Sequence, residues 1–268
     1  MARNGHPVFT YTDIIKRALE HENVVVGWSG GRCSTIVLHK VLQYKPDVQV
    51  IYTNTGIEFP ENVEYVHELT DLWGVNLAEL HPERTFWDIV DEFGMPKFRK
   101  FGSDRRTKLL QSYGKKVDRR PMCCFYLKEK PRYEYYKQHN VEADITGLRA
   151  AESRVRAIVL GQKGQFYTVS NPKGLTTYHP ISLWSTEKCE AYNKKYGIPH
   201  NPVYDTQTRN GCWACTAYKG WKKNIIKYNP RMYKLLQGKL GVTLMDDYIP
   251  NLMPCDTDFL DKTAGDLQ

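Results

Sequence analysis

The 268-residue sequence lacks the long apolar segments that membrane proteins need. It has no run of about 18 apolar residues, and its first residues lack the apolar stretch of a secretion signal. Internal repeats and low-complexity segments are missing as well. We therefore expect a cytoplasmic globular protein without a membrane partner. The predicted organisation is a single domain (residues 1–268), with a core at 23–210 and an extension at 211–268.

The two commonest phosphate-binding fingerprints are also missing. The sequence contains neither Gly-x-Gly-x-x-Gly nor Gly-x-x-x-x-Gly-Lys-Ser/Thr. Instead, three consecutive valines at 24–26 predict a buried strand, and a Ser-Gly-Gly turn follows before a helix that covers 34–42. A strand, a glycine turn and a helix N-terminus together form a phosphate site. The residues expected to bind the phosphates are Ser29, Gly30, Gly31, Arg32 and Ser34.

Strand and helix patterns alternate along the rest of the chain. Further strands are expected at 48–53, 75–80 and 143–148, with a short edge strand at 166–170. Helices are expected at 11–22 (with Thr12 as N-cap), 61–73, 122–138, 186–196 and 220–236, the last divided at Pro230. Short helices and loops that order on substrate binding are expected at 85–120. This alternation predicts an α/β fold, a Rossmann-like parallel sheet flanked by helices.

Ligands of such sheets bind at the carboxyl ends of the strands. Thr55 and Gly56 follow the second strand, and Arg149 and Arg156 follow the fourth. Arginine binds phosphate or sulfate with forked donors, although an ion pair with Glu152 is an alternative role for either one. The net charge of +8 likewise favours a phosphate-rich partner, either a nucleotide or a nucleic acid.

Four of the seven cysteines form two close pairs in the sequence. Cys123 and Cys124 are adjacent, and Cys212 and Cys215 form a Cys-x-x-Cys motif about 90 residues later. Four thiolates suit a [4Fe–4S] cluster, and adjacent thiolates fit a cluster with several iron corners better than one zinc ion. A Cys₄ zinc site and buried structural cysteines are the alternatives. Cys189 and Cys255 are expected to be ordinary residues or residues that carry sulfur.

Several segments resemble a known family. Residues 29–34 (Ser-Gly-Gly-Arg-Cys-Ser) resemble the PP-loop of adenine-nucleotide α-hydrolases, where Lys-Asp usually stands in place of Arg32 and Cys33. Residues 54–61, 147–156 and 201–212 resemble segments of the phosphoadenylylsulfate (PAPS) reductase family. The cysteine pattern resembles its iron–sulfur branch, the adenylylsulfate reductases. The resemblance implies an adenine nucleotide-hydrolase-like fold with a C-terminal cluster-binding extension.

The sequence departs from the reductases at one decisive point. It lacks their Glu-Cys-Gly-(Leu/Ile)-His tail, and the acidic neighbours Asp256 and Asp258 oppose thiolate formation at Cys255. The retained Ser-Gly-Gly and the Gly-Cys-Trp-x-Cys-Thr segment resemble the iron–sulfur ATP pyrophosphatases of DNA phosphorothioation.

This resemblance favours a sulfur-transfer enzyme that uses ATP, with Mg²⁺, to adenylylate an acceptor such as a DNA phosphate. Arg149, Arg156 and Cys33 would be its catalytic residues, and Cys33 would be a sulfur carrier or a packed thiol. A cysteine desulfurase, DNA and a second copy of the chain are the expected partners. The alternatives are an adenylylsulfate or PAPS reductase and a non-catalytic nucleotide-binding module.

Overall fold

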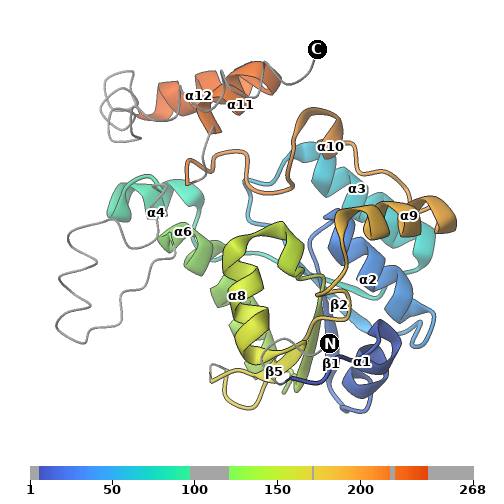
Figure 1. Cartoon of the computed structure of the whole chain (residues 1–268). Coiled ribbons are helices and arrows are strands. Elements are labelled where there is room, and N and C mark those ends of the chain that lie inside the picture. Colours follow the sequence, from blue (N-terminus) through green and yellow to red (C-terminus); the bar gives the residue numbers. More distant parts are fainter. Residues whose placement is uncertain (1–5, 97–120, 171, 218–220, 241–268) are drawn as a thin grey trace. The chain divides into compact units, whose positions relative to one another are not determined.

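A computed structural model describes residues 6–96, 121–170, 172–217 and 221–240 of the chain (Figure 1). The chain divides into two compact units. The first consists of Met1–Thr85 and Tyr126–Asn210, and the second of Phe86–Phe125 and Gly211–Gln268. The organisation of the whole chain as one domain stays a prediction.

The first unit is built on a six-stranded sheet. Its strands are β1 (Val24–Trp28), β2 (Gln49–Thr53), β3 (Leu77–Leu80), β4 (Ala143–Thr146), β5 (Phe166–Thr168) and β6 (Thr176–Tyr178), in the order β3-β2-β1-β4-β6-β5. All neighbours are parallel except β5 and β6. The predicted parallel sheet and the edge position of β5 are confirmed. The sequence analysis missed β6, which has only three residues, none of them aliphatic.

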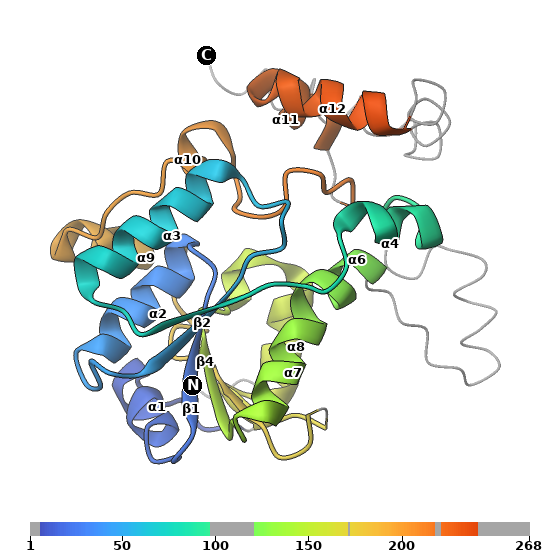
Figure 2. The same cartoon turned by 180° about the vertical axis from the view of Figure 1, so that it is seen from behind.

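Helices α1 (Tyr11–Ala18), α2 (Arg32–Leu42), α3 (Pro60–Trp73) and α9 (Thr186–Tyr196) cover one face of the sheet (Figures 1 and 2). Their apolar side chains pack on the side of β1 that carries Val24 and Val26. The N-cap of α1 is Thr10, whose hydroxyl accepts a hydrogen bond from the Asp13 amide, while the Asp13 carboxylate accepts one from the Thr10 amide. The prediction of Thr12 as N-cap was wrong, since the cap lies two residues earlier, at Thr10.

Helix α7 (Lys130–Gln138) lies on the opposite face, and so does α8 (Arg154–Lys163) (Figure 2). A buried polar contact fixes α7 on the sheet. Arg132 Nη2 donates to Asp144 Oδ2 of β4 at 2.6 Å, and the Tyr136 hydroxyl donates to the same oxygen at 2.8 Å. Gly27 leaves room for this guanidinium, because a Cβ there would lie 2.7 Å from Arg132 Nη2.

The predicted helix over 122–138 is interrupted by a wider turn. It consists of α6 (Met122–Cys124), a π-helical segment η2 (Phe125–Glu129) and then α7. Pro131 in the first turn of α7 has no backbone N–H, so it cannot donate the α-helical bond to the preceding turn. A π-turn accommodates this gap without ending the helical course of the chain.

Two strands of the first unit define where a ligand enters. The strand order reverses between β1 and β4, so the connections after these two strands leave on opposite faces of the sheet. A crevice forms at the carboxyl ends of such a pair, and ligands of open α/β sheets bind there. The Ser-Gly-Gly turn after β1 and the arginine segment after β4 both reach this edge. The short elements η3 (Ala150–Glu152) and α10 (Val203–Thr206) belong to the same unit.

The regular elements in the described part of the second unit are helices. They are α4 (Phe86–Phe93), α6, α11 (Trp221–Tyr228) and α12 (Pro230–Leu240). The predicted break at Pro230 is confirmed, because this residue begins α12. Within the described residues of either unit, no helix is long and apolar enough to cross a membrane. Cys255 and the basic stretches between 97 and 120 lie outside the described residues.

Candidate nucleotide site and cysteine group

The PP-loop (residues 29–34) joins β1 to α2 and is tied down from within. Gly30 has a φ of +71°, a conformation that favours glycine. Gly31 is the N-cap of α2 and has no side chain to cap the helix. The Ser34 hydroxyl donates to the Gly31 carbonyl at 2.9 Å, and its oxygen lies 3.1 Å from Ser29 Oγ. The first turn of a helix then supplies amide donors and a positive dipole end for an anion.

Three asparagines hold the carbonyl groups of the loop. Asn201 Nδ2 donates to the Gly30 carbonyl at 2.9 Å, and Asn210 Nδ2 donates to the Ser29 carbonyl at 2.7 Å. Both amides also donate to Asn62 Oδ1, at 2.7 and 2.8 Å. The loop carbonyls are therefore held on the protein side, which leaves the other side of the loop for a ligand. Asn62 and Asn210 were missed by the sequence analysis, because a single asparagine in a helix or loop carries no distinctive pattern.

The end of β4 lies against the same loop. A Cβ on Gly147 would come within 2.6 Å of the Cys33 carbonyl carbon and 2.5 Å of the Ser34 amide nitrogen. Only glycine allows this approach of two backbone segments. The backbone segments that follow β1 and β4 therefore lie in contact at the carboxyl edge of the sheet.

Arg149 extends from this segment to Cys33. Its Nε donates to Cys33 Sγ at 3.0 Å, and its Nη1 donates to the Trp184 carbonyl just before α9 at 3.1 Å. The guanidinium is buried, with 6 % of its residue surface exposed. Arg149 therefore joins the first turn of α2 to the start of α9.

Besides Arg149, Cys33 has a neighbouring thiol, that of Cys189 on α9. A hydrogen bond between the two thiols, followed by burial, raises the pKa of Cys33, while the same bond lowers the pKa of Cys189 with help from Arg149. The first proton of the pair is therefore lost from Cys189, and Cys33 keeps the second. This pairing was not expected, since the two residues are 156 positions apart.

Arg156 lies near the same group. It forms an ion pair with Glu152, as the alternative reading of the sequence anticipated. Its pKa is lowered by burial and by the positive charges of Arg209 and Arg149, so three arginines share one neighbourhood. Such a concentration of positive charge suits a phosphate or sulfate group.

His179 lies near Arg156 and is uncharged at neutral pH. Its Nδ1 is 2.7 Å from Thr146 Oγ1, and 4 % of the residue is exposed. Burial and the charge of Arg156 lower the pKa of His179 to about 4, so the ring is neutral at pH 7. It therefore adds no charge to the arginine group.

Thr55 and Gly56 lie at the carboxyl end of β2, next to β1. The Thr55 hydroxyl donates to Glu58 Oε1 at 3.0 Å, which makes it part of a buried polar contact. Gly56 has a φ of +73°, and the space that a Cβ would occupy there is open. The backbone of Gly56 is thus accessible to a ligand, whereas the side chain of Thr55 is already engaged.

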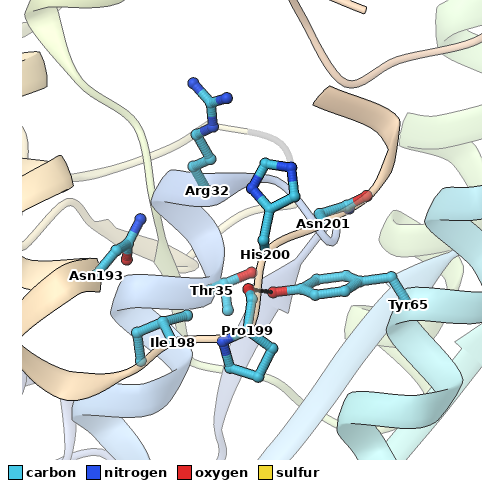
Figure 3. Close-up of a pocket in the computed structure, with 8 residues that line it drawn as sticks. All are labelled: Arg32, Thr35, Tyr65, Asn193, Ile198, Pro199, His200 and Asn201. Carbon is cyan, nitrogen blue, oxygen red and sulfur yellow. Dashed lines mark hydrogen bonds between the residues drawn. The ribbon is translucent and has the colours of Figure 1, made fainter. Parts of the chain in front are cut away.

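Tyr204 occupies the start of α2. Its hydroxyl accepts a hydrogen bond from the Arg32 amide at 3.2 Å, and the Arg32 guanidinium lies 3.9 Å above its ring. A pocket adjoins this contact, lined by Arg32, Thr35, Tyr65, Asn193, Ile198, Pro199, His200 and Asn201 (Figure 3). Its floor is fixed by Tyr65, which donates to the Pro199 carbonyl at 2.9 Å.

All four cysteines of the predicted metal site belong to the second unit. Cys123 and Cys124 lie on α6, and Cys212 and Cys215 lie in the segment that follows residue 210. A hydrogen bond with Cys124 and burial raise the pKa of Cys123, and the charges of Cys215 and Cys212 add to this. The four thiols are thus neighbours. Among the described residues, however, no group of three or more His, Cys, Asp or Glu side chains has an arrangement that holds a metal ion.

Residues 23–218 match the phosphoadenosine phosphosulfate reductase domain, which is most of the chain. The chain belongs to the PAPS reductase family. An adenosine 5′-phosphosulfate reductase of Streptomyces coelicolor is 29 % identical over 68 % of this chain and 66 % of its own length. An uncharacterised protein of Methanocaldococcus jannaschii is 27 % identical over 76 % of this chain, which spans only 38 % of that relative.

The fold of the family is confirmed by a solved relative. The PAPS reductase of Candida auris, crystallised as a phosphate complex, superposes with a TM-score of 0.55 at 17 % identity, covering 76 % of this chain and 89 % of its own. Relatives of this family include reductases of adenosine 5′-phosphosulfate and of phosphoadenosine 5′-phosphosulfate. The assignment of individual site residues stays a prediction.

Proposed function

We propose that this protein is a sulfur-transfer enzyme that uses ATP to activate an acceptor oxygen. One observation supports this proposal more than any other. The Cys33 thiol lies in the first turn of α2, next to the phosphate-binding loop, and accepts a hydrogen bond from Arg149. A thiol at that point is placed to carry sulfur to a group activated by the nucleotide.

The loop residues have separate roles in the proposed reaction. Ser29, Gly30, Gly31, Arg32 and Ser34 bind the phosphates of ATP, and Gly56 approaches the nucleotide with its backbone. Arg149 and Arg156 bind the charge that develops when pyrophosphate leaves. Mg²⁺ would accompany ATP as part of the substrate.

The chemistry has two steps. An acceptor oxygen, such as that of a DNA phosphate, attacks the α-phosphorus of ATP and releases pyrophosphate. Sulfur from a cysteine desulfurase, held on Cys33 as a persulfide, then displaces AMP from the acceptor, and an external thiol cleaves the remaining sulfur–sulfur bond. The second step needs a nucleophilic sulfur. The positive helix N-terminus and Arg149 favour the anionic form of the persulfide on Cys33.

We further propose that Cys123, Cys124, Cys212 and Cys215 bind a [4Fe–4S] cluster in the second unit. The chemistry of the donor set supports this proposal, because four cysteine thiolates are the usual ligands of such a cluster. Among the described residues the four thiols are not arranged around one metal position, so binding of the cluster would have to draw them together. When bound, the cluster supplies an electron carrier or a structural link between the two segments that carry the cysteines.

The test follows pyrophosphate release from ATP and sulfite release from adenylylsulfate and PAPS, each with a thiol reductant. We expect pyrophosphate and AMP in the presence of DNA and a cysteine desulfurase, and no sulfite. Cys255→Ser should leave this activity intact, and Cys33→Ser should abolish sulfur transfer while keeping nucleotide binding.

The second candidate is an adenylylsulfate or PAPS reductase. The names of the relatives favour it, since several are reductases of these two sulfonucleotides. In that case the assay yields sulfite, and the loss of sulfite in Cys255→Ser identifies the thiol that attacks the sulfate sulfur. This outcome would replace sulfur transfer by sulfate reduction.

A further inference from the structure

We propose that Cys33 and Cys189 are a redox-active dithiol that closes to a disulfide beside the phosphate-binding loop. The inference concerns a modification site in the first unit and does not depend on which reaction the enzyme catalyses. It also does not involve the four cysteines of the second unit.

The two thiols are brought together by packing that is independent of their chemistry. Cys33 lies against the apolar core to which Cys189 belongs. Helices α2 and α9 are joined one to two turns further on, where Tyr192 Oη lies 2.9 Å from His39 Nδ1. Arg149 connects the other end, with bonds to Cys33 Sγ and to the Trp184 carbonyl before α9. Both helices are therefore fixed on either side of the sulfur pair.

The two thiols differ in their access to solvent. Cys33 is partly exposed at the loop, whereas 4 % of Cys189 is exposed. An oxidant from solution therefore reaches Cys33 first. Cys189 lies behind it and is placed to react with the oxidised sulfur before a second oxidant molecule arrives.

The environment favours the reactive form of the pair. The pKa of Cys189 is lowered by its hydrogen bond to Cys33 and by the positive charge of Arg149, so Cys189 is the thiol of the pair that ionises first and is placed to take the proton of Cys33. The N-terminus of α2 adds a positive dipole end at Cys33.

Formation of the disulfide removes two electrons, which a peroxide accepts. Cys33 transfers its proton to the Cys189 thiolate and its sulfur attacks one oxygen of hydrogen peroxide. This breaks the O–O bond and gives a sulfenic acid and hydroxide, which takes a proton from solvent to become water. Cys189 then attacks Cys33 Sγ, which forms the S–S bond and releases the sulfenic oxygen as a second water. A thiol reductant reverses the reaction by disulfide exchange. Formation of the bond withdraws Cys33 Sγ from Arg149 and so alters the loop that binds phosphate.

Peptide mapping of the full-length protein tests the proposal directly. The purified chain is treated with hydrogen peroxide, blocked with an alkylating reagent and cut with trypsin. Trypsin cuts after Arg32 and Lys188, so the cross-link would join residues 33–40 to residues 189–194. We expect this cross-linked peptide in about tenfold excess over any that joins Cys33 to another cysteine, and its loss after dithiothreitol.

Two variants separate the roles of the thiols. In Cys189→Ser, Cys33 should accumulate as a sulfenic acid that dimedone traps, because the second thiol is missing. In Cys33→Ser, the buried Cys189 should stay reduced under the same treatment. The inference is overturned if wild-type protein gives no 33–40/189–194 cross-link, or if Cys189 is oxidised equally well without Cys33. The wild-type measurement decides the matter even if a variant folds poorly.

Discussion

Gly30 and Gly31 are adjacent, yet the structure gives them different roles. A Cβ on Gly30 would collide with Asn62 Oδ1, and its positive φ disfavours any other residue. A Cβ on Gly31 meets only side-chain atoms, with Ser29 Oγ nearest at 3.3 Å and Tyr204 Oη at 3.5 Å. The first glycine is therefore required for folding of the loop, and the second for space on its ligand side.

Alanine at the two positions should separate stability from binding. Gly30→Ala is expected to lower the free energy of unfolding by about 3 kcal/mol, because it adds both strain and a clash. Gly31→Ala should change that free energy by less than about 1 kcal/mol while raising the dissociation constant of ATP about tenfold. Urea unfolding and calorimetric titration measure the two effects. Equal loss of stability in both variants would contradict these roles.

His179 makes the stability of the first unit depend on pH. Burial and the charge of Arg156 lower its pKa from 6.5 to about 4, so between these values the unfolded chain takes up a proton that the folded chain does not. The contribution of His179 to the free energy of unfolding is therefore fully present above pH 6.5 and is lost as the pH falls toward 4. The expected loss from this group is about 2 kcal/mol between pH 7.5 and pH 5.

The variant His179→Gln keeps hydrogen-bonding capacity but does not titrate in this range. Urea unfolding of both proteins at several pH values gives the comparison, in which other titrating groups cancel. We expect the free energy of unfolding of the variant to fall less steeply on acidification. Parallel curves for the two proteins would show that His179 does not carry this dependence.

At the scale of elements, the contact between β4 and α2 is the most constrained in the site. Gly147→Ala places a methyl group against the backbone of Cys33 and Ser34, which cannot move without shifting the first turn of α2. We expect a loss of about 3 kcal/mol in the free energy of unfolding and weaker nucleotide binding.

Gly238→Ala in α12 is the matched control for this substitution. A Cβ at Gly238 meets no atom within 4 Å, and alanine is the better helix former. The control should be neutral or slightly stabilising in denaturant unfolding. If Gly147→Ala behaves like the control, the close approach of the two backbones is not needed for the site.

The sequence predicted the elements that have a strong local pattern. Strand β1, helix α3 and the capped helix α9 all show apolar periodicity with clear ends, and the structure confirms them. Strand β6 was missed, because its pairing with β4 and β5 is decided by the sheet and not by its own residues. The π-turn at η2 was missed for a similar reason, since its cause is a proline that follows it.

In the candidate site, too, residues that form a local pattern could be predicted and long-range pairs could not. The PP-loop and the arginine segment could be located because the residues of each are close together in the sequence. The Asn62 contact and the Cys33–Cys189 pair connect residues far apart in the chain, so only the packing of helices brings them together. Sequence spacing holds no information about such pairs without a known fold.

At the scale of the whole molecule, we expect cysteines of the second unit, and not those of the first, to determine the metal content of the protein. If the four cysteines bind a [4Fe–4S] cluster, anaerobically purified protein should be brown and contain about four irons per chain. Serine at Cys123, Cys124, Cys212 or Cys215 should remove the iron, while Cys189→Ser should retain it. Iron analysis and absorbance spectra measure this, and colourless protein with one zinc would contradict the cluster.

The second unit is assembled from two segments that flank the later half of the first unit. During synthesis, the ribosome therefore completes the chain through residue 210 before Cys212 and Cys215 are made. Cys123 and Cys124 must wait for these partners while some 90 residues are added, about 5–20 s at ordinary elongation rates. The sheet and its phosphate-binding loop have time to fold in that interval. If the four cysteines bind the proposed cluster, its insertion is therefore a late event that acts on a nearly finished protein.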